Sequence, residues 1–109
     1  MNKMQIFDLN AMEAYPQADR DKNVFYKTER FKTRIIELPP GSEIPPCEMT
    51  SHVILFVVKG IVEVTVNKER AIIRNGKCLI TEPATLSMKS ENGAKLMGIQ
   101  IERPKVSPK

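Results

Sequence analysis

The stretch Gly41-Ser-Glu-Ile-Pro-Pro-Cys-Glu-Met-Thr-Ser-His-Val-Ile-Leu-Phe-Val-Val-Lys-Gly60 decides how this 109-residue chain folds. It begins and ends with glycine, and it holds the pair Pro45-Pro46 and the apolar run Val53 to Val58. Short runs of β-branched and aromatic residues between glycines and prolines are typical of strands. We therefore predict loop or strand-edge structure at the prolines, then a strand that ends in a turn at Gly60.

The residues after Gly60 continue the β pattern. Val62, Val64 and Val66 alternate with Glu63 and Thr65, which predicts a strand with one buried and one wet face. Tight turns are expected at Asn67-Lys68 and Asn75-Gly76. The predicted strands are Val24 to Lys27, Phe31 to Leu38, His52 to Val58, Ile61 to Asn67, Arg70 to Arg74, Cys78 to Thr81, Thr85 to Ser90 and Lys95 to Glu102.

Many short strands without intervening helices predict an all-β domain, either a sandwich or a closed barrel. We assign the barrel to residues 21–102 and an N-terminal cover to residues 1–20. In the cover, Asn10 and Glu13 have the spacing of a capping box, so a short helix that Pro16 stops is expected. Its apolar residues, Ile6, Phe7, Leu9 and Met12, would lie over the core. Residues 103–109, with two prolines and three cations, predict a flexible basic tail.

Two segments resemble the motifs of the cupin superfamily. Gly41 to Gly60 has the glycine spacing of the first cupin motif, and Gly76-Lys-Cys-Leu-Ile-Thr-Glu-Pro83 resembles the second. With the hairpin between them, the motifs cover about half of the chain. The resemblance implies a jelly-roll β-barrel, commonly dimeric, with a ligand or metal pocket inside one end.

The residues at the usual metal-ligand positions depart from the family. The two histidine positions of the first motif fall on Cys47 and Met49, the glutamate position falls on Val53, and the later histidine position falls on Ser87. Divalent metals such as Fe(II), Mn(II) and Zn(II) prefer imidazole and carboxylate ligands, which Met, Val and Ser do not supply. We therefore expect no metal cofactor, and a barrel in which Cys47, Met49, Val53 and Ser87 line a small-molecule site.

One cluster leaves a metal open as an alternative. Cys47-x-Met49-x-x-His52 combines a thiol, a thioether and an imidazole, which together suit copper or zinc. Strand alternation argues against it, because His52 points outward if Cys47, Met49 and Val53 point inward. His52 is the chain's only histidine, so a diverged isomerase or metal-dependent cupin would rely on Cys47 and His52.

Composition narrows the partners and the location. Three of the 17 basic residues lie in residues 103–109, so the remainder is nearly neutral against 13 acidic residues and does not predict nucleic-acid binding. The locally basic segment Arg20 to Arg34 is interpreted as a solvated strand face.

No apolar run is long enough to cross a membrane, and no secretory signal is seen, which predicts a cytoplasmic protein. Cys47 and Cys78 form no CxxC pair and are expected to be reduced, mostly buried thiols.

These observations lead to a functional expectation with two alternatives. The leading hypothesis is a small single-domain cupin that binds an apolar or sugar-like molecule in the barrel without the usual metal. The alternatives are a diverged cupin enzyme that uses Cys47 and His52, and a dimeric structural or regulatory module. In each case the expected assembly is a homodimer.

Overall fold

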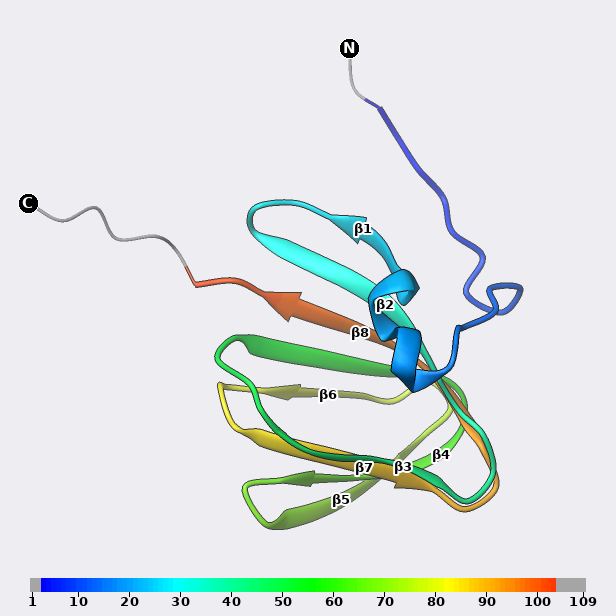
Figure 1. Ribbon diagram of the computed structural model, residues 1–109, viewed down its shortest axis with the longest axis vertical. Helices are drawn as coiled ribbons and strands as arrows, with labels where there is room; N and C mark the ends of the chain where they lie inside the picture. The colour runs from blue at the N-terminus through cyan, green and yellow to red at the C-terminus, as the bar shows by residue number, and fades with distance from the viewer. Residues whose placement is uncertain (1–2, 104–109) are drawn as a thin grey trace, which may run out of the picture.

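The computed structural model describes residues 3–103, and their regular structure is nearly all strand (Figure 1). The one helix in this range is a short 3₁₀ helix. The elements are η1 Gln17–Asn23, β1 Val24–Lys27, β2 Phe31–Leu38, β3 Ser42–Glu48, β4 His52–Val66, β5 Glu69–Arg74, β6 Cys78–Thr81, β7 Thr85–Ser90 and β8 Ala94–Ile101. The prediction of an all-β fold is confirmed.

Strand β4 organises the sheet because it takes part in both halves of it. Its first half pairs with β8 on one side and β6 on the other, and β8 continues to β2 and β1. Its second half pairs with β5 and β7, and β7 continues to β3. All of these pairings are antiparallel. The sheet therefore curls into the open barrel of a jelly roll, with the two halves facing each other (Figure 1).

The core lies between these two halves. Along β4 the buried side chains are Val53, Leu55 and Val57 in the first half, and Val62 and Val64 in the second. The buried residues are odd-numbered in the first half and even-numbered in the second. If side chains alternated strictly along the whole strand, the even-numbered residues of the second half would face away from the core. The register shift between Val57 and Lys59 corrects this. The strand that the sequence splits at Gly60 is thus one continuous strand with a bulge.

Strand β3 was not predicted, because Pro45 and Pro46 indicated a loop or strand edge. In the structure both prolines lie within β3, which pairs only with β7 and forms an edge of the sheet. The register shifts between Ile44 and Cys47, at the prolines. An edge strand needs hydrogen-bond donors on one side only, so it tolerates residues without a backbone N–H.

The predicted helix after Asn10 is wrong. Asp8 forms a single turn instead, because its Oδ1 accepts hydrogen bonds from the backbone N–H of Asn10 (3.1 Å) and Ala11 (3.4 Å). Its backbone carbonyl also accepts from Ala11 and Met12. Pro16 leaves too few residues for a further turn before it, and the 3₁₀ helix η1 starts after this proline.

The predicted cover is only partly packed. Ile6 is 88% exposed, so it does not lie over the core as expected, whereas Leu9 and Met12 are half-buried. The predicted tail falls mostly on residues 104–109, outside the described residues. None of the helical segments in residues 3–103 has the length and apolar character needed to cross a membrane.

Candidate functional site: a cavity inside the barrel

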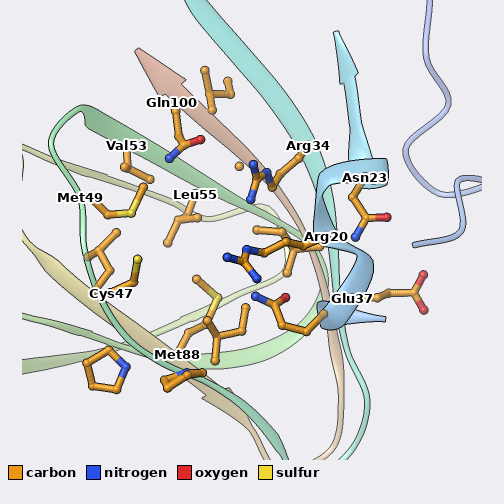
Figure 2. Close-up of a pocket in the computed structure, with 18 of the residues that line it drawn as sticks. Arg20, Asn23, Arg34, Glu37, Cys47, Met49, Val53, Leu55, Met88 and Gln100 are labelled. Atoms are coloured by element: carbon orange, nitrogen blue, oxygen red, sulfur yellow. The ribbon is translucent and has the colours of Figure 1, made fainter. Parts of the chain in front are cut away.

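A cavity of about 340 Å³ opens between the two halves of the sheet. Strands β2, β3, β4, β7 and β8 supply its walls, and the segment from Tyr15 to Asn23 lies at its rim (Figure 2). Its volume falls within the range of natural small-molecule sites.

The inner part of the cavity is apolar. Strand alternation turns Val53 and Leu55 of β4 and Leu86 and Met88 of β7 inward, and all four are at most 8% exposed. Met49 lies beside them and packs against the same core. An apolar ligand surface placed here would be removed from water, at about 25 cal/mol per Å² of area buried.

The half-sheet that carries Val53 and Leu55, across from Leu86 and Met88, also carries polar and positively charged groups. Arg34 of β2 and Gln100 of β8 both face the cavity, and Arg20 of η1 points into it from the rim (Figure 2). The Nε atom of Arg34 and the Oε1 atom of Gln100 are buried and have no hydrogen-bond partner among the described residues. Burial lowers the pKa of Arg34; nearby Asp21 raises it, and nearby Arg20 lowers it further. The guanidinium still stays charged at neutral pH.

The rim segment is held in place by Asn23, which is only 6% exposed. Its Oδ1 accepts a hydrogen bond from the N–H of Tyr15 (2.7 Å), and its Nδ2 donates to the carbonyl of Tyr15 (3.1 Å). This double contact closes the loop that contains η1, so Arg20 is presented to the cavity from an anchored segment.

Three of the four predicted site residues line this cavity, namely Cys47, Met49 and Val53. Ser87 does not, because its neighbours Leu86 and Met88 take the inward positions of β7. Ser87 instead lines a second hollow of about 210 Å³ on the outer side of the sheet.

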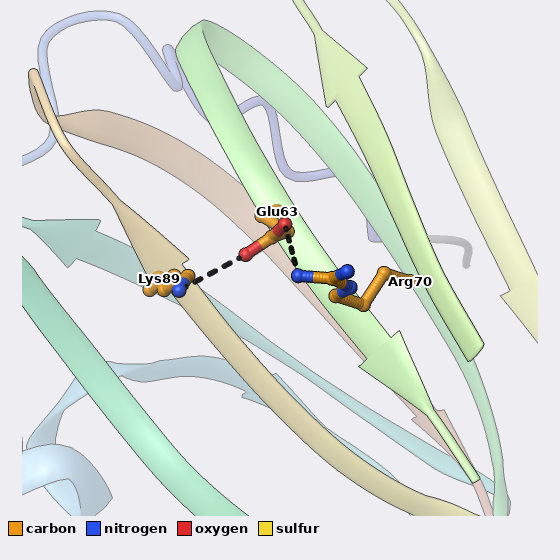
Figure 3. A network of polar contacts seen from close by, with 3 residues as sticks. All are labelled: Glu63, Arg70 and Lys89. Atoms are coloured by element: carbon orange, nitrogen blue, oxygen red, sulfur yellow. Dashed lines mark ion pairs between the residues drawn. The ribbon is translucent and has the colours of Figure 1, made fainter. Parts of the chain in front are cut away.

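The second hollow contains a small charge network (Figure 3). Glu63 forms ion pairs with Lys89 (3.3 Å) and Arg70 (3.9 Å), and the side chains of both cations are more than half exposed. Exposed pairs of this kind contribute little to stability. The network occupies the wet face predicted for Glu63, away from the main cavity.

The Cys47, Met49 and His52 side chains do not converge on one point. Cys47 and Met49 line the cavity, whereas His52 is exposed and pairs in register with Ile101 on the outer face of the sheet. Within residues 3–103, no group of three or more His, Cys, Asp or Glu side chains could hold a metal ion. Of the soft-metal cluster that the sequence left open, the structure brings Cys47 and Met49 to one cavity and leaves His52 outside it.

Both cysteines are exposed, so the prediction of buried thiols is wrong. Cys47 lies on the edge strand β3 beside the open cavity, and Cys78 starts β6 at the outer side of the sheet. No other part of the described chain covers either cysteine. The apolar character of cysteine, on which the prediction of burial rested, does not show whether a strand position is covered.

Sequence reasoning missed Arg34, Gln100 and Arg20. The interpretation of the basic segment as a solvated face is wrong for Arg34, whose Nε is buried. Strand β2 carries apolar residues on both faces, so alternation did not say which face of it is inside. The partners in register decide it, because Arg34 lies opposite Gly98 and Ile36 opposite the fully buried Leu96.

Comparisons with known proteins agree with this architecture. No protein-family model matches the chain, and no curated protein matches it. Among solved structures, a Thermus thermophilus protein is 24% identical, with a TM-score of 0.79 over 93% of this chain and 100% of that one. A Streptococcus pyogenes protein of unknown function is 10% identical, with a TM-score of 0.75 over 96% of this chain and 93% of that one.

A third similar structure carries the family name. It is a cupin superfamily protein from Desulfitobacterium hafniense, 10% identical, with a TM-score of 0.68 over 73% of this chain and 74% of that one. Backbones that are this similar over most of their length share strand order and sheet curvature, although their side chains and functions can differ. The chain therefore has the fold of the cupin superfamily, as its two cupin-like motifs predicted.

Proposed function

We propose that this protein binds a small molecule in the cavity between the two halves of its sheet, and that it does so without a bound metal. The observation that carries the proposal is the cavity itself, about 340 Å³ with an apolar inner part and a few polar groups at one wall. This combination is typical of ligand sites, in which apolar area supplies affinity and a few polar atoms fix orientation.

The two cysteines offer a matched test of the site. N-phenyl-1-naphthylamine, an uncharged dye that fluoresces in apolar surroundings, is expected to bind the wild-type chain. Cys47→Phe should reduce this binding because the new ring would occupy the cavity, whereas Cys78→Phe should not, because Cys78 does not line it. Fluorescence titration measures both, and equal dye binding by the two variants would contradict the proposal.

A separate control tests the proposal that binding needs no metal. Dye binding is expected to be unchanged after the protein is treated with EDTA, since the sulfur ligands that line the cavity are one thiol and two thioethers, and no imidazole lines it. Loss of binding after EDTA, with recovery on adding Zn(II) or Cu(I), would contradict this part and favour the metal-dependent alternative.

We also propose that the chain forms a homodimer through the outer face of the half-sheet that contains β6. The register aligns apolar residues across this face, from Ile80 through Ile54 to Ile99, and from Phe56 to Met97. Ile80 is 67% exposed, and Ile101 at the edge of the face is 40% exposed. A contiguous apolar face of this kind is typical of an interface, and a second copy would supply a surface of the same character.

Ile80→Asp is expected to dissociate the dimer, because each copy would bring an unpaired carboxylate into an apolar interface. Ile72→Asp is the control, because Ile72 is similarly exposed at 62% but lies on β5, in the other half of the sheet. Sedimentation equilibrium gives the mass of each. A monomeric wild-type protein, or dissociation by Ile72→Asp alone, would refute this interface.

A further inference from the structure

Two cations, Arg20 and Arg34, line the cavity, and Arg34 lies beside Leu55 on the half-sheet that faces Leu86 and Met88. Arg20 and Arg34 lie near enough to influence each other, since Arg20 lowers the pKa of Arg34. Among residues 3–103 neither of them forms an ion pair. The Glu37 side chain points away from both (Figure 2), and its Oε1 accepts a hydrogen bond from the N–H of Ala14 (3.3 Å). Asp21 is the acidic group whose charge acts on Arg34.

The position of Arg34 is built into the sheet. Gly98 lies opposite it in register, and a Cβ atom at position 98 would come within 3.8 Å of Arg34 Cγ and 3.2 Å of Ile36 Cδ1. The absence of a side chain there leaves room for the arginine stem to lie across β8. The guanidinium is thus supported by the inner wall of the barrel, unlike a surface arginine that extends into water.

The unpartnered buried atoms in this wall call for partners from a ligand. A buried N–H without an acceptor costs about 1–3 kcal/mol, so the free site holds an unsatisfied donor at Arg34 Nε. The Gln100 Oε1 atom is an unsatisfied acceptor in the same wall. An anion would satisfy the guanidinium, and a rotated Gln100 amide could donate from its nitrogen to the same anion.

We infer that the ligand is a small monocarboxylic acid whose carboxylate meets Arg34, with Arg20 and Gln100 beside it, and whose apolar body lies against Leu55, Leu86 and Met88. This inference rests on the proposed function and adds the chemical class of the ligand. The planar fork of arginine matches a carboxylate in a two-bond geometry. Leu55 beside the arginine and Leu86 and Met88 across the cavity form an apolar surface, which a compact inorganic anion would leave unfilled.

The test compares two compounds that share the same hydrocarbon chain and carry either a charged carboxylate or a neutral amide. Hexanoate and hexanamide are used to displace N-phenyl-1-naphthylamine from the full chain in low-salt buffer at pH 7. Hexanoate is expected to displace the dye at a concentration at least about tenfold lower than hexanamide, the ratio expected for one hydrogen bond to a charged group. Equal displacement by the two compounds, with dye binding intact, would overturn the carboxylate inference and leave the proposed function standing. No dye binding would overturn both.

Variants of the arginines locate the effect. Arg34→Gln should abolish the preference for hexanoate and Arg20→Gln should weaken it, whereas the exposed Arg74→Gln should leave it unchanged. A preference retained in Arg34→Gln would overturn the inference. Thermal unfolding checks that each variant is folded, and Arg34→Gln is not expected to lower the Tm because it removes a buried donor that has no partner.

Discussion

Gly60→Ala is expected to destabilise the protein by about 3 to 5 kcal/mol, from left-handed backbone strain together with overpacking. Gly60 has a φ of +97°, which disfavours residues that carry a side chain. A Cβ atom here would also collide with the carbonyl oxygen of Gly93 and lie only 2.8 Å from Cα of Ala94. Both obstacles are backbone atoms of the paired strand end, so neither can rotate away.

The matched control is Gly76→Ala. Gly76 has a similar φ of +80°, but a Cβ atom added there would meet nothing within 4 Å. This variant should cost only the conformational term, about 1–2 kcal/mol. Urea unfolding measured for the wild type and both variants separates strain from collision. Equal losses of unfolding free energy would show that the close approach of Gly60 and Gly93 does not matter.

Lys95→Met is expected to lower the unfolding free energy by about 2–3 kcal/mol, the contribution of hydrogen bonds to a charged group. Lys95 is only 6% exposed, although it lies on the outer face of β8. Its Nζ donates to the carbonyls of Leu9 (3.2 Å) and Asn10 (3.0 Å), and also to that of Met12. One ammonium group thus holds the turn after Asp8 against the sheet, and methionine keeps the volume without the donors.

Limited proteolysis shows which part of the chain loses stability in Lys95→Met. In Lys95→Met, chymotrypsin is expected to cut within residues 7–15 faster than in the wild type, because the segment is released. Lys77→Met is the control, since Lys77 is exposed and the structure records no side-chain hydrogen bond for it. Unchanged protease protection of the segment in Lys95→Met would mean that other contacts hold it.

The sequence predicted strands and turns correctly where the local residue pattern agrees with the position of the segment in the folded sheet. The hairpin turn at Asn67-Lys68 is an example, because both residues adopt positive φ (48° and 75°), as the asparagine suggested. The prediction failed at β3, where the position at the edge of the sheet makes prolines acceptable. It failed again before Pro16, where the Asp8 carboxylate accepts the hydrogen bond of the Asn10 N–H, which Glu13 would have accepted in the predicted capping box.

The candidate site was predictable in its apolar part and not in its polar part. The cupin resemblance led to Cys47, Met49 and Val53, which the structure brings to one cavity. Arg34 and Gln100 lie 66 positions apart in the sequence and carry no motif. They share a wall only because β2 and β8 pair along their full length.

The sequence by itself indicated every strand except β3, and its cupin resemblance indicated the barrel, because glycine spacing and side-chain alternation are local properties. Tertiary structure decided which side of each strand is inside. It placed Ser87 and His52 outside the cavity, exposed both cysteines, and turned Arg34 inward. The physical reason is that facing depends on bulges and on partners in register, such as the shift after Val57 and the pairing of Arg34 with Gly98.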